Sequence, residues 1–104
     1  YVDDAADGMI AATFSEHVGT YNLTKSHSCT LEEAANLAVK LAGKGSVSMH
    51  AKDDDFPSRG ALNIDAARKD FGFDPKVDID EGFQIYYDWL TNSSYWAVNK
   101  AQVA

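Results

Sequence analysis

Hydrophobic residues recur every three or four positions in four parts of this chain, which is the spacing of one face of an α-helix. The spacing predicts helices over residues 5–16, 31–42, 63–71 and 79–92. In the first of these segments Ala6, Met9, Ile10 and Phe14 form one apolar stripe, and in the second Leu31, Ala34, Ala38 and Leu41 form a stripe that we expect to be buried. Four helices are therefore the main expectation.

Polar residues mark the ends of the predicted helices. Asp3 and Asp4 stand where an N-cap carboxylate would accept hydrogen bonds from the first turn of a helix. The run from Thr30 to Glu33 has the form of a capping box, in which a hydroxyl and a carboxylate three residues apart each satisfy a free backbone N–H. Gly43 and Gly72 follow predicted helices, where glycine favours the left-handed turn that closes them.

Two short segments alternate between apolar and polar residues instead. In residues 20–24 the side chains of Tyr21 and Leu23 share one side, and in residues 46–51 those of Val47, Met49 and Ala51 do. This period of two is typical of a β-strand with one solvated face. The sequence thus predicts a small α+β domain of about four helices and two short strands over residues 1–92, followed by a tail, 93–104, with no clear periodicity.

Composition and charge narrow the possible functions. The chain has 104 residues, enough for one domain with a modest core. Its net charge of −7 opposes nucleic-acid binding, because that affinity comes largely from Lys and Arg on phosphates. No apolar run approaches the roughly 20 residues that cross a bilayer, no leader opens the chain, and the single Cys29 fits a reducing compartment. We therefore expect a soluble cytoplasmic protein that binds neither nucleic acid nor membrane.

Five short motifs occur in a fixed order along the chain. They are Tyr1-Val-Asp-Asp4, Tyr21-Asn-Leu-Thr24, Arg59-Gly-Ala-Leu-Asn63, Gly72-Phe-Asp-Pro75 and Asp80-Glu-Gly-Phe83. Together they resemble the C-terminal third of the extended short-chain dehydrogenase/reductases, the NAD-dependent epimerases and dehydratases of nucleotide sugars. The resemblance extends to about Leu90 and does not include the nucleotide-binding Rossmann half of those enzymes.

The resemblance implies a division of labour between this portion and a longer parent enzyme. In the parent, NAD exchanges a hydride with the sugar ring, and the catalytic tyrosine and lysine lie in the N-terminal half. The portion in hand would form the substrate side and carry no catalytic residue, cofactor or metal of its own. The alternative is an independent binding or assembly module that has the same architecture and no catalytic half.

Arg59 is the candidate substrate-binding residue. In the enzymes that the chain resembles, an arginine on the loop after the last strand binds the substrate diphosphate, and Arg59 stands at that place. A guanidinium suits this role because its planar fork donates two parallel hydrogen bonds to phosphate oxygens. The alternative is a solvated arginine paired with Asp53, Asp54 or Asp55. The family pattern that follows the arginine is only partly kept, since Asn63 and Ala66 stand where Asp and Lys are common.

Other possible sites are weaker. Tyr21 and Lys25 match the Tyr-x-x-x-Lys spacing of the superfamily, but that pair acts from one face of a helix, and a strand would place the two residues about 13 Å apart. The Gly-x-Gly-x-x-Gly turn that binds a dinucleotide is missing from the sequence. His27 and Cys29 do not predict a zinc site. Without its other half, we expect the chain to associate with a second copy through Tyr21 or the fourth helix.

Overall fold

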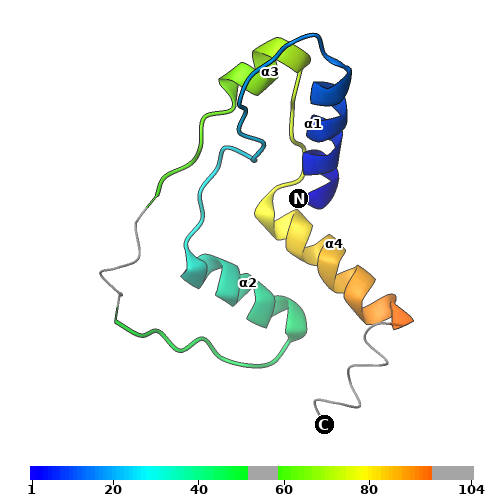
Figure 1. Ribbon diagram of the computed structural model, residues 1–104. Helices are drawn as coiled ribbons and strands as arrows, with labels where there is room; N and C mark the ends of the chain where they lie inside the picture. Colours follow the sequence, from blue (N-terminus) through cyan, green and yellow to red (C-terminus); the bar gives the residue numbers. More distant parts are fainter. Residues whose placement is uncertain (52–58, 95–104) are drawn as a thin grey trace.

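The computed structural model describes residues 1–51 and 59–94, and everything said below of its structure concerns these residues (Figure 1). The predicted loop residues 52–58 and most of the predicted tail, 95–104, lie outside this range. The helices are α1 (Val2–Phe14), α2 (Leu31–Ala42), α3 (Asp65–Phe71) and α4 (Ile79–Asn92). Each of the four predicted helices is thus confirmed, to within two or three residues at its ends.

The predicted α+β class is wrong, because the described residues form helices and no strand. Both predicted strands, 20–24 and 46–51, are irregular segments. A strand needs a neighbour whose backbone N–H and C=O groups pair with its own, and neither segment has such a neighbour in the described part. The alternation at Tyr21 and Leu23 has another cause, since both side chains pack against the small buried core.

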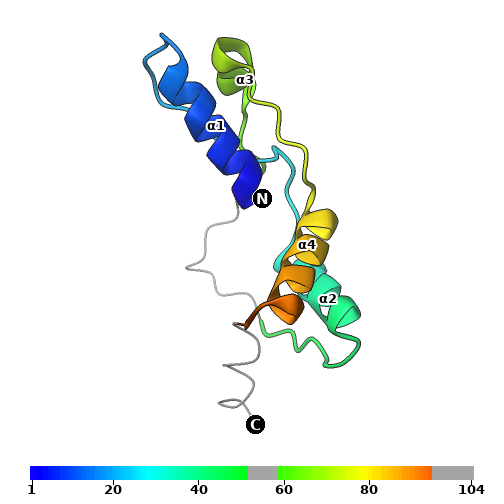
Figure 2. The ribbon, with the colours of Figure 1, turned by 90° about the vertical axis from the view of Figure 1, so that its right-hand side faces the viewer.

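The helices form two pairs that meet near the start of α4. Helix α1 packs against α3, and α2 packs against α4 (Figures 1 and 2). The molecule measures 51 × 39 × 20 Å, so it is about two helix diameters thick. Its radius of gyration is 17.4 Å, whereas a compact chain of this length has about 13 Å. The helices therefore spread into an open slab and do not enclose one central core.

The core is small and lies beneath α1 and α3. Its buried hydrophobic residues are Ile64, Ala67 and Phe73, and Tyr21, Leu23 and Phe71 cover them in part. The ring of Tyr21 meets that of Phe71 edge to face, with centroids 4.8 Å apart. Helix α1 approaches this core through Gly8, where an added Cβ would lie 2.8 Å from the ring of Phe73. Only glycine at position 8 lets the backbone of α1 come so close to the Phe73 ring.

The ends of α2 follow the sequence closely. The Glu33 N–H donates to Thr30 Oγ1 at 3.1 Å, and the Thr30 N–H donates to Glu33 Oε2 at 2.7 Å, which completes the predicted capping box. Gly43 closes the helix with φ 66°, as predicted. The expected buried stripe is wrong, however, because no residue of α2 is buried and Leu31 is 88% exposed. The predicted ends of α2 are confirmed, but Leu31 and Ala38 of the expected stripe are exposed, and Ala34 and Leu41 are only partly buried although α2 packs against α4.

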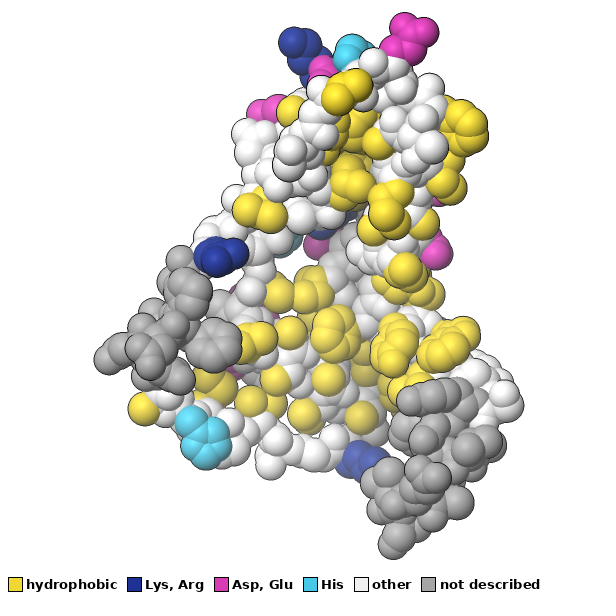
Figure 3. All heavy atoms as spheres, in the orientation of Figure 1, with side chains coloured by type: hydrophobic (Ala, Val, Ile, Leu, Met, Phe, Trp, Pro, Cys, Tyr) yellow, Lys and Arg dark blue, Asp and Glu magenta, His cyan; other side chains and the backbone are white. Residues whose placement is uncertain are grey.

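Helix α1 differs from the expectation at its start, and its apolar side faces outward. Tyr1 occupies the N-cap position without a side-chain hydrogen bond, so the expected aspartate cap is wrong. Large apolar side chains of α1 point to solvent, and we call Val2, Met9, Ile10 and Phe14 the α1 stripe. One broad face of the molecule shows hydrophobic side chains over α1, α2 and α4 (Figure 3). None of the described helices is both long and apolar enough to span a membrane.

Candidate functional site

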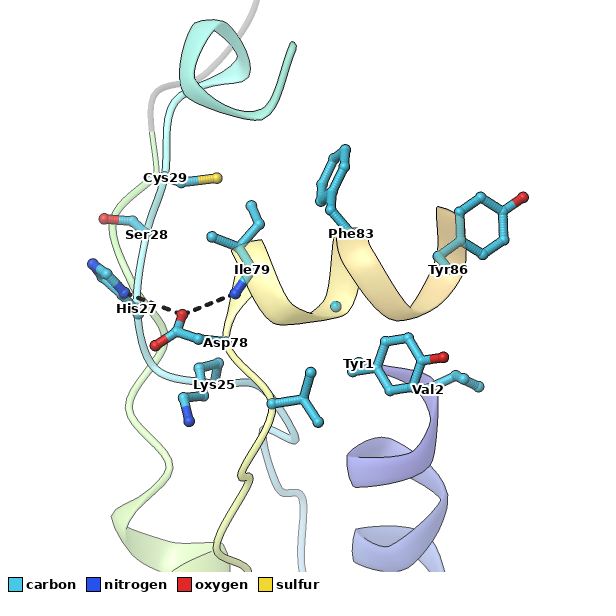
Figure 4. Close-up of a pocket in the computed structure, with 12 residues that line it drawn as sticks. Tyr1, Val2, Lys25, His27, Ser28, Cys29, Asp78, Ile79, Phe83 and Tyr86 are labelled. Atoms are coloured by element: carbon cyan, nitrogen blue, oxygen red, sulfur yellow. Dashed lines mark hydrogen bonds and ion pairs between the residues drawn. The ribbon is translucent and has the colours of Figure 1, made fainter. Parts of the chain in front are cut away.

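A pocket of about 660 Å³ lies where the first turn of α1 meets the first half of α4 (Figure 4). Its walls are mainly apolar and come from Tyr1 and Val2 of the chain start and from Ile79, Phe83 and Tyr86 of α4. The segment before α2 supplies the polar rim, with Lys25, His27, Ser28 and Cys29. This size and character are those of a site for a small molecule or for a side chain of a partner.

Asp78 joins the rim to α4. Its Oδ1 accepts a hydrogen bond from the N–H of Ile79 at 3.0 Å, so Asp78 caps the helix. The same oxygen lies 3.6 Å from His27 Nδ1 (Figure 4). The Ile79 N–H and, to a smaller extent, His27 lower the pKa of the Asp78 carboxyl, so it is ionised at neutral pH. Both side chains are well exposed, so the pair adds little to the stability of the fold and its main effect is to orient the two groups.

The floor of the pocket is fixed by two charged side chains. Lys25 Nζ donates to the carbonyl oxygens of Pro75 at 3.1 Å and Lys76 at 2.8 Å. From the opposite direction, Asp4 accepts the N–H groups of Lys76 and Val77, each at 2.9 Å. Partial burial tends to raise the pKa of the Asp4 carboxyl, but these N–H donors outweigh it and the pKa is lowered. Lys25 and Asp4 thus hold the segment before α4 in place.

Tyr21 and Lys25, which match the catalytic spacing, serve different structural partners. The Tyr21 hydroxyl donates to Asp70 Oδ2 at 2.8 Å, and this bond raises the pKa of the phenol. Lys25 instead binds the two backbone carbonyls described above. In the family chemistry the lysine would lower the pKa of the phenol, which is the opposite of what Asp70 does here. The two side chains thus have separate structural partners, and an irregular segment, not the predicted strand, lies between them.

Cys29 and His27 of the rim are not arranged as a nucleophile and its base. A nucleophile needs a base within hydrogen-bond reach. Cys29 is an exposed free thiol, and Figure 4 shows its sulfur and the His27 ring pointing in opposite directions, while the His27 Nδ1 faces Asp78. Groups of three or more side chains able to hold a metal ion do not occur among the described residues. What the arrangement can do is bind, with an apolar cavity and a His–Asp pair at its mouth.

Arg59, the predicted substrate-binding residue, does not line this pocket. It is exposed and stands at the beginning of the second described stretch, so the alternative, a pairing with Asp53, Asp54 or Asp55, involves residues outside the described part. The chain is anchored just after it, because Ser26 Oγ donates to the Leu62 carbonyl at 2.9 Å. The structure therefore leaves the role of Arg59 as a prediction and places the residue close to a fixed point.

Asn63 holds the start of α3, although Ile64 and not Asn63 occupies the N-cap position. Its Oδ1 accepts the N–H of Asp65 at 2.7 Å and so satisfies the first turn of α3. Its carbonyl oxygen accepts a hydrogen bond from Asn22 Nδ2 at 2.9 Å. The segment between Arg59 and α3 is thus tied to residues 22–26 at two points, Leu62 and Asn63.

Sequence reasoning did not single out the pocket or its polar rim. The contacts of Asp4 and Lys25 with residues 75–77 join positions about 50 to 70 residues apart, and no local pattern reports such pairs. An aspartate directly before a helix, such as Asp78, is a local capping signal, but it does not report the contact with His27. A charged residue beside an irregular segment, such as Lys25, gives no sign of its partner.

Comparison with known proteins gives one distant relationship. Over 83 residues, which are 79% of the chain, the sequence is 25% identical to UDP-glucuronic acid decarboxylase 1 of Arabidopsis thaliana. The matched part is only 19% of the length of that relative. No family model matches the chain, and no solved structure matches it significantly. The similarity is a distant link to the nucleotide-sugar enzymes of the epimerase/dehydratase family.

Proposed function

We propose that this chain is the substrate-side C-terminal portion of an NAD-dependent enzyme that acts on a nucleotide sugar, and that it is inactive alone. The observation that carries the proposal is the 83-residue similarity to a UDP-glucuronic acid decarboxylase, which extends over most of the chain. The ordered motifs from Tyr1 to Phe83 support the same family. Because the relative is named for a uridine-diphosphate sugar acid, we propose a UDP-sugar as the substrate class.

The open form of the molecule supports a role as part of a larger protein. Ile64, Ala67 and Phe73 are the buried hydrophobic residues of the described part, while many large apolar side chains are exposed. A stable monomer rarely leaves so much apolar surface in water. Such a surface is expected where one portion of an enzyme normally packs against another.

Within this proposal, Arg59 binds the diphosphate of the substrate from one wall of the complete site. NAD, held by the nucleotide-binding half, would supply reversible hydride transfer with the sugar ring. The sequence of this chain lacks the glycine-rich turn that binds a dinucleotide, so its own contribution is to bind and orient the substrate. Three other side chains would act only indirectly, because they fix neighbouring backbone and do not touch the substrate. Asn22 and Ser26 hold the segment that follows Arg59, and Lys25 holds the segment before α4.

The coding sequence upstream of Tyr1 provides the test. We expect an open frame that encodes a glycine-rich strand–helix turn and a helical Tyr-x-x-x-Lys, and we expect the full polypeptide to convert a UDP-sugar with bound NAD. The 104-residue chain alone should neither convert the sugar nor bind NAD in a calorimetric titration. A start codon beside Tyr1, or saturable one-to-one NAD binding by this chain, would contradict the proposal and favour an independent module.

A further inference from the structure

The α1 stripe is exposed along the whole length of its helix. The exposed fractions are 68% for Val2, 58% for Met9, 56% for Ile10 and 84% for Phe14. Val2 and Met9 follow the spacing i, i+7, and Ile10 and Phe14 follow i, i+4, so the four side chains form two adjacent rows on one side of α1. Figure 3 shows hydrophobic side chains gathered over this helix.

The other side of α1 is already used by the core. Gly8 faces Phe73 and Leu23 so closely that an added Cβ would lie 2.8 Å and 3.1 Å from their side chains. Helix α1 therefore turns its smallest residue inward and its largest apolar residues outward. The contact of Gly8 with Phe73 therefore keeps the stripe turned away from the described core.

The charges beside the stripe identify the kind of surface that would cover it. Asp3 and Asp7 are exposed and precede Ile10 by seven and three residues, so they extend the row of Ile10 and Phe14. Helix α1 contains no Lys or Arg. Two copies of this helix placed face to face would bring these carboxylates together, and like charges at a contact oppose association. The net charge of −7 acts in the same direction.

The position of the stripe in the chain identifies the source of that surface. Val2 begins the stripe and, with Tyr1, lines the wall of the pocket, so a polypeptide joined to Tyr1 starts at the head of the stripe. A tethered surface meets the stripe at a high effective concentration, which a free partner does not. The relative extends far beyond the matched segment, which is 19% of its length.

From these observations we propose that the α1 stripe docks onto an apolar, basic-bordered surface of the nucleotide-binding half that precedes Tyr1 in the same polypeptide. This inference rests on the proposed function and adds the contact through which the two halves meet. The apolar side chains provide the affinity of the contact. Asp3 and Asp7 pair with its basic border and disfavour a second copy of this chain.

Thiol accessibility in the full-length polypeptide tests the contact. With Cys29→Ser as background, Ile10→Cys introduces a single new thiol in the stripe, and Lys40→Cys introduces the matched control at an exposed position of α2. We expect the thiol at position 10 to react at least roughly tenfold more slowly than the thiol at position 40. A docked thiol reacts only while the contact is open, and a tenfold slower rate corresponds to an open contact in about a tenth of the molecules. Equal rates would overturn the inference.

Two further measurements separate the alternatives. The double change Asp3→Lys and Asp7→Lys should speed labelling at position 10 in the full-length polypeptide, because it removes the attraction to a basic border. Glu32→Lys on α2 is the control and should not change the labelling rate. If the double change has no effect, the inference that the docking surface has a basic border is overturned. In the 104-residue chain, labelling at position 10 should not depend on protein concentration. Slower labelling at high concentration would identify a second copy as the occupant and overturn the inference.

Failure of this inference can be told apart from failure of the proposed function. Turnover of a UDP-sugar by the same full-length polypeptide is measured separately from thiol labelling. If the polypeptide converts the UDP-sugar but position 10 is labelled fast, the proposed function is supported and the docking of the α1 stripe is rejected. Slow labelling without any turnover would leave the contact standing and reject the function.

Discussion

Asp4 and Val77 are 73 residues apart in the sequence, yet the Val77 N–H donates a hydrogen bond to Asp4 Oδ2 at 2.9 Å. The neighbouring Lys76 N–H donates to the second oxygen of the same carboxylate, also at 2.9 Å. One side chain in the first turn of α1 therefore holds the backbone that leads into α4. This contact positions the start of both helices, and with them the two walls of the pocket.

Replacing Asp4 with Asn should lower the stability of the chain. An amide has one oxygen, so it can accept one of the two N–H groups and leaves the other without its charged acceptor. A hydrogen bond to a charged group contributes about 1.5 to 3 kcal/mol, and solvent screening at the partly exposed Asp4 reduces this, so we expect a loss of about 1 to 2 kcal/mol in the free energy of unfolding. Chemical denaturation measures it, and Asp3→Asn, an exposed change in the same turn, should alter stability by less than about 0.5 kcal/mol. Equal effects at the two positions would contradict the assigned role of Asp4.

Stability should fall in acid. Burial is the largest single effect on the pKa of Asp4 and raises it, but the Lys76 and Val77 N–H groups together outweigh burial and the pKa is lowered; the Ile79 N–H likewise lowers the pKa of Asp78. A carboxyl with a lowered folded pKa stabilises the fold above its unfolded pKa, about 3.9, and this stabilisation is lost as the pH falls through the folded value. Unfolding followed by circular dichroism should show a decline below about pH 4, and Asp4→Asn should make that decline shallower. A stability that is constant or rises on acidification would refute the prediction.

Two glycines inside helices should respond differently to the same change. Gly82→Ala places a methyl group 3.4 Å from Tyr1, an ordinary contact, so the better helix propensity of alanine should stabilise the chain by up to about 1 kcal/mol. Gly8→Ala gains the same propensity but forces a Cβ to within 2.8 Å of the Phe73 ring. Such overpacking costs about 1 to 3 kcal/mol, so the net change should be destabilising. Thermal unfolding of the two variants compares them directly, and stabilisation by Gly8→Ala would show that α1 and Phe73 are less close than described.

In the full-length enzyme, Arg59→Ala should raise KM and lower kcat without unfolding the protein, because Arg59 is exposed. The loss of a charge-assisted contact with the diphosphate corresponds to roughly a tenfold to hundredfold loss in affinity. Arg68→Ala is the matched control, since Arg68 is also exposed but faces Asp65 on α3 at 3.6 Å. Kinetics unchanged by Arg59→Ala, or changed equally by both substitutions, would return Arg59 to the role of a solvated loop residue.

The 104-residue chain should self-associate at high micromolar concentration through α4. Tyr86 is exposed and its ring stacks on that of Trp89 with centroids 5.7 Å apart, which provides a rigid aromatic surface. Salt should strengthen the association, because it screens the repulsion between chains of net charge −7. Light scattering at several concentrations tests this, with Tyr86→Ser expected to weaken association and Lys40→Ser, on α2, expected not to. A monodisperse monomer throughout would show that the chain is stable with this surface in water.

The other expected contact, Tyr21, is partly buried and bonded to Asp70, so its contribution should be small.

Helix ends were predictable where the chemistry is local. The capping box of Thr30 and Glu33 and the left-handed turn at Gly43 involve residues a few positions apart, and the structure has both. The predicted strands failed because an alternating pattern records only which side a side chain occupies. It does not show whether another backbone lies alongside to pair with it. At Tyr21 the inward side chain instead meets Phe71 and Asp70.

Burial and the site were harder to predict than the helices. The spacing of Leu31 with the alanines of α2 predicted an apolar face correctly, but the sequence contains no information on whether that face is covered, and Leu31 is exposed. Asp4 had the position of a helix cap and instead binds a distant backbone segment. The candidate pocket depends on such distant contacts, so its walls could not be assembled from the sequence alone. Arg59 was proposed from family resemblance, and its role stays a prediction.

The two carbonyl contacts of Lys25 have a consequence for the chemistry of its amine. Two of the three N–H groups of this ammonium donate to the carbonyl oxygens of Pro75 and Lys76, so its nitrogen is held against the backbone and is less accessible to an electrophile than a lysine nitrogen in open water. Lys25 should therefore react slowly with acylating reagents, compared with lysines that extend freely into water. Once acylated, it would lose its charge and much of its donor capacity, and the segment that leads into α4 would then depend on the Asp4 carboxylate.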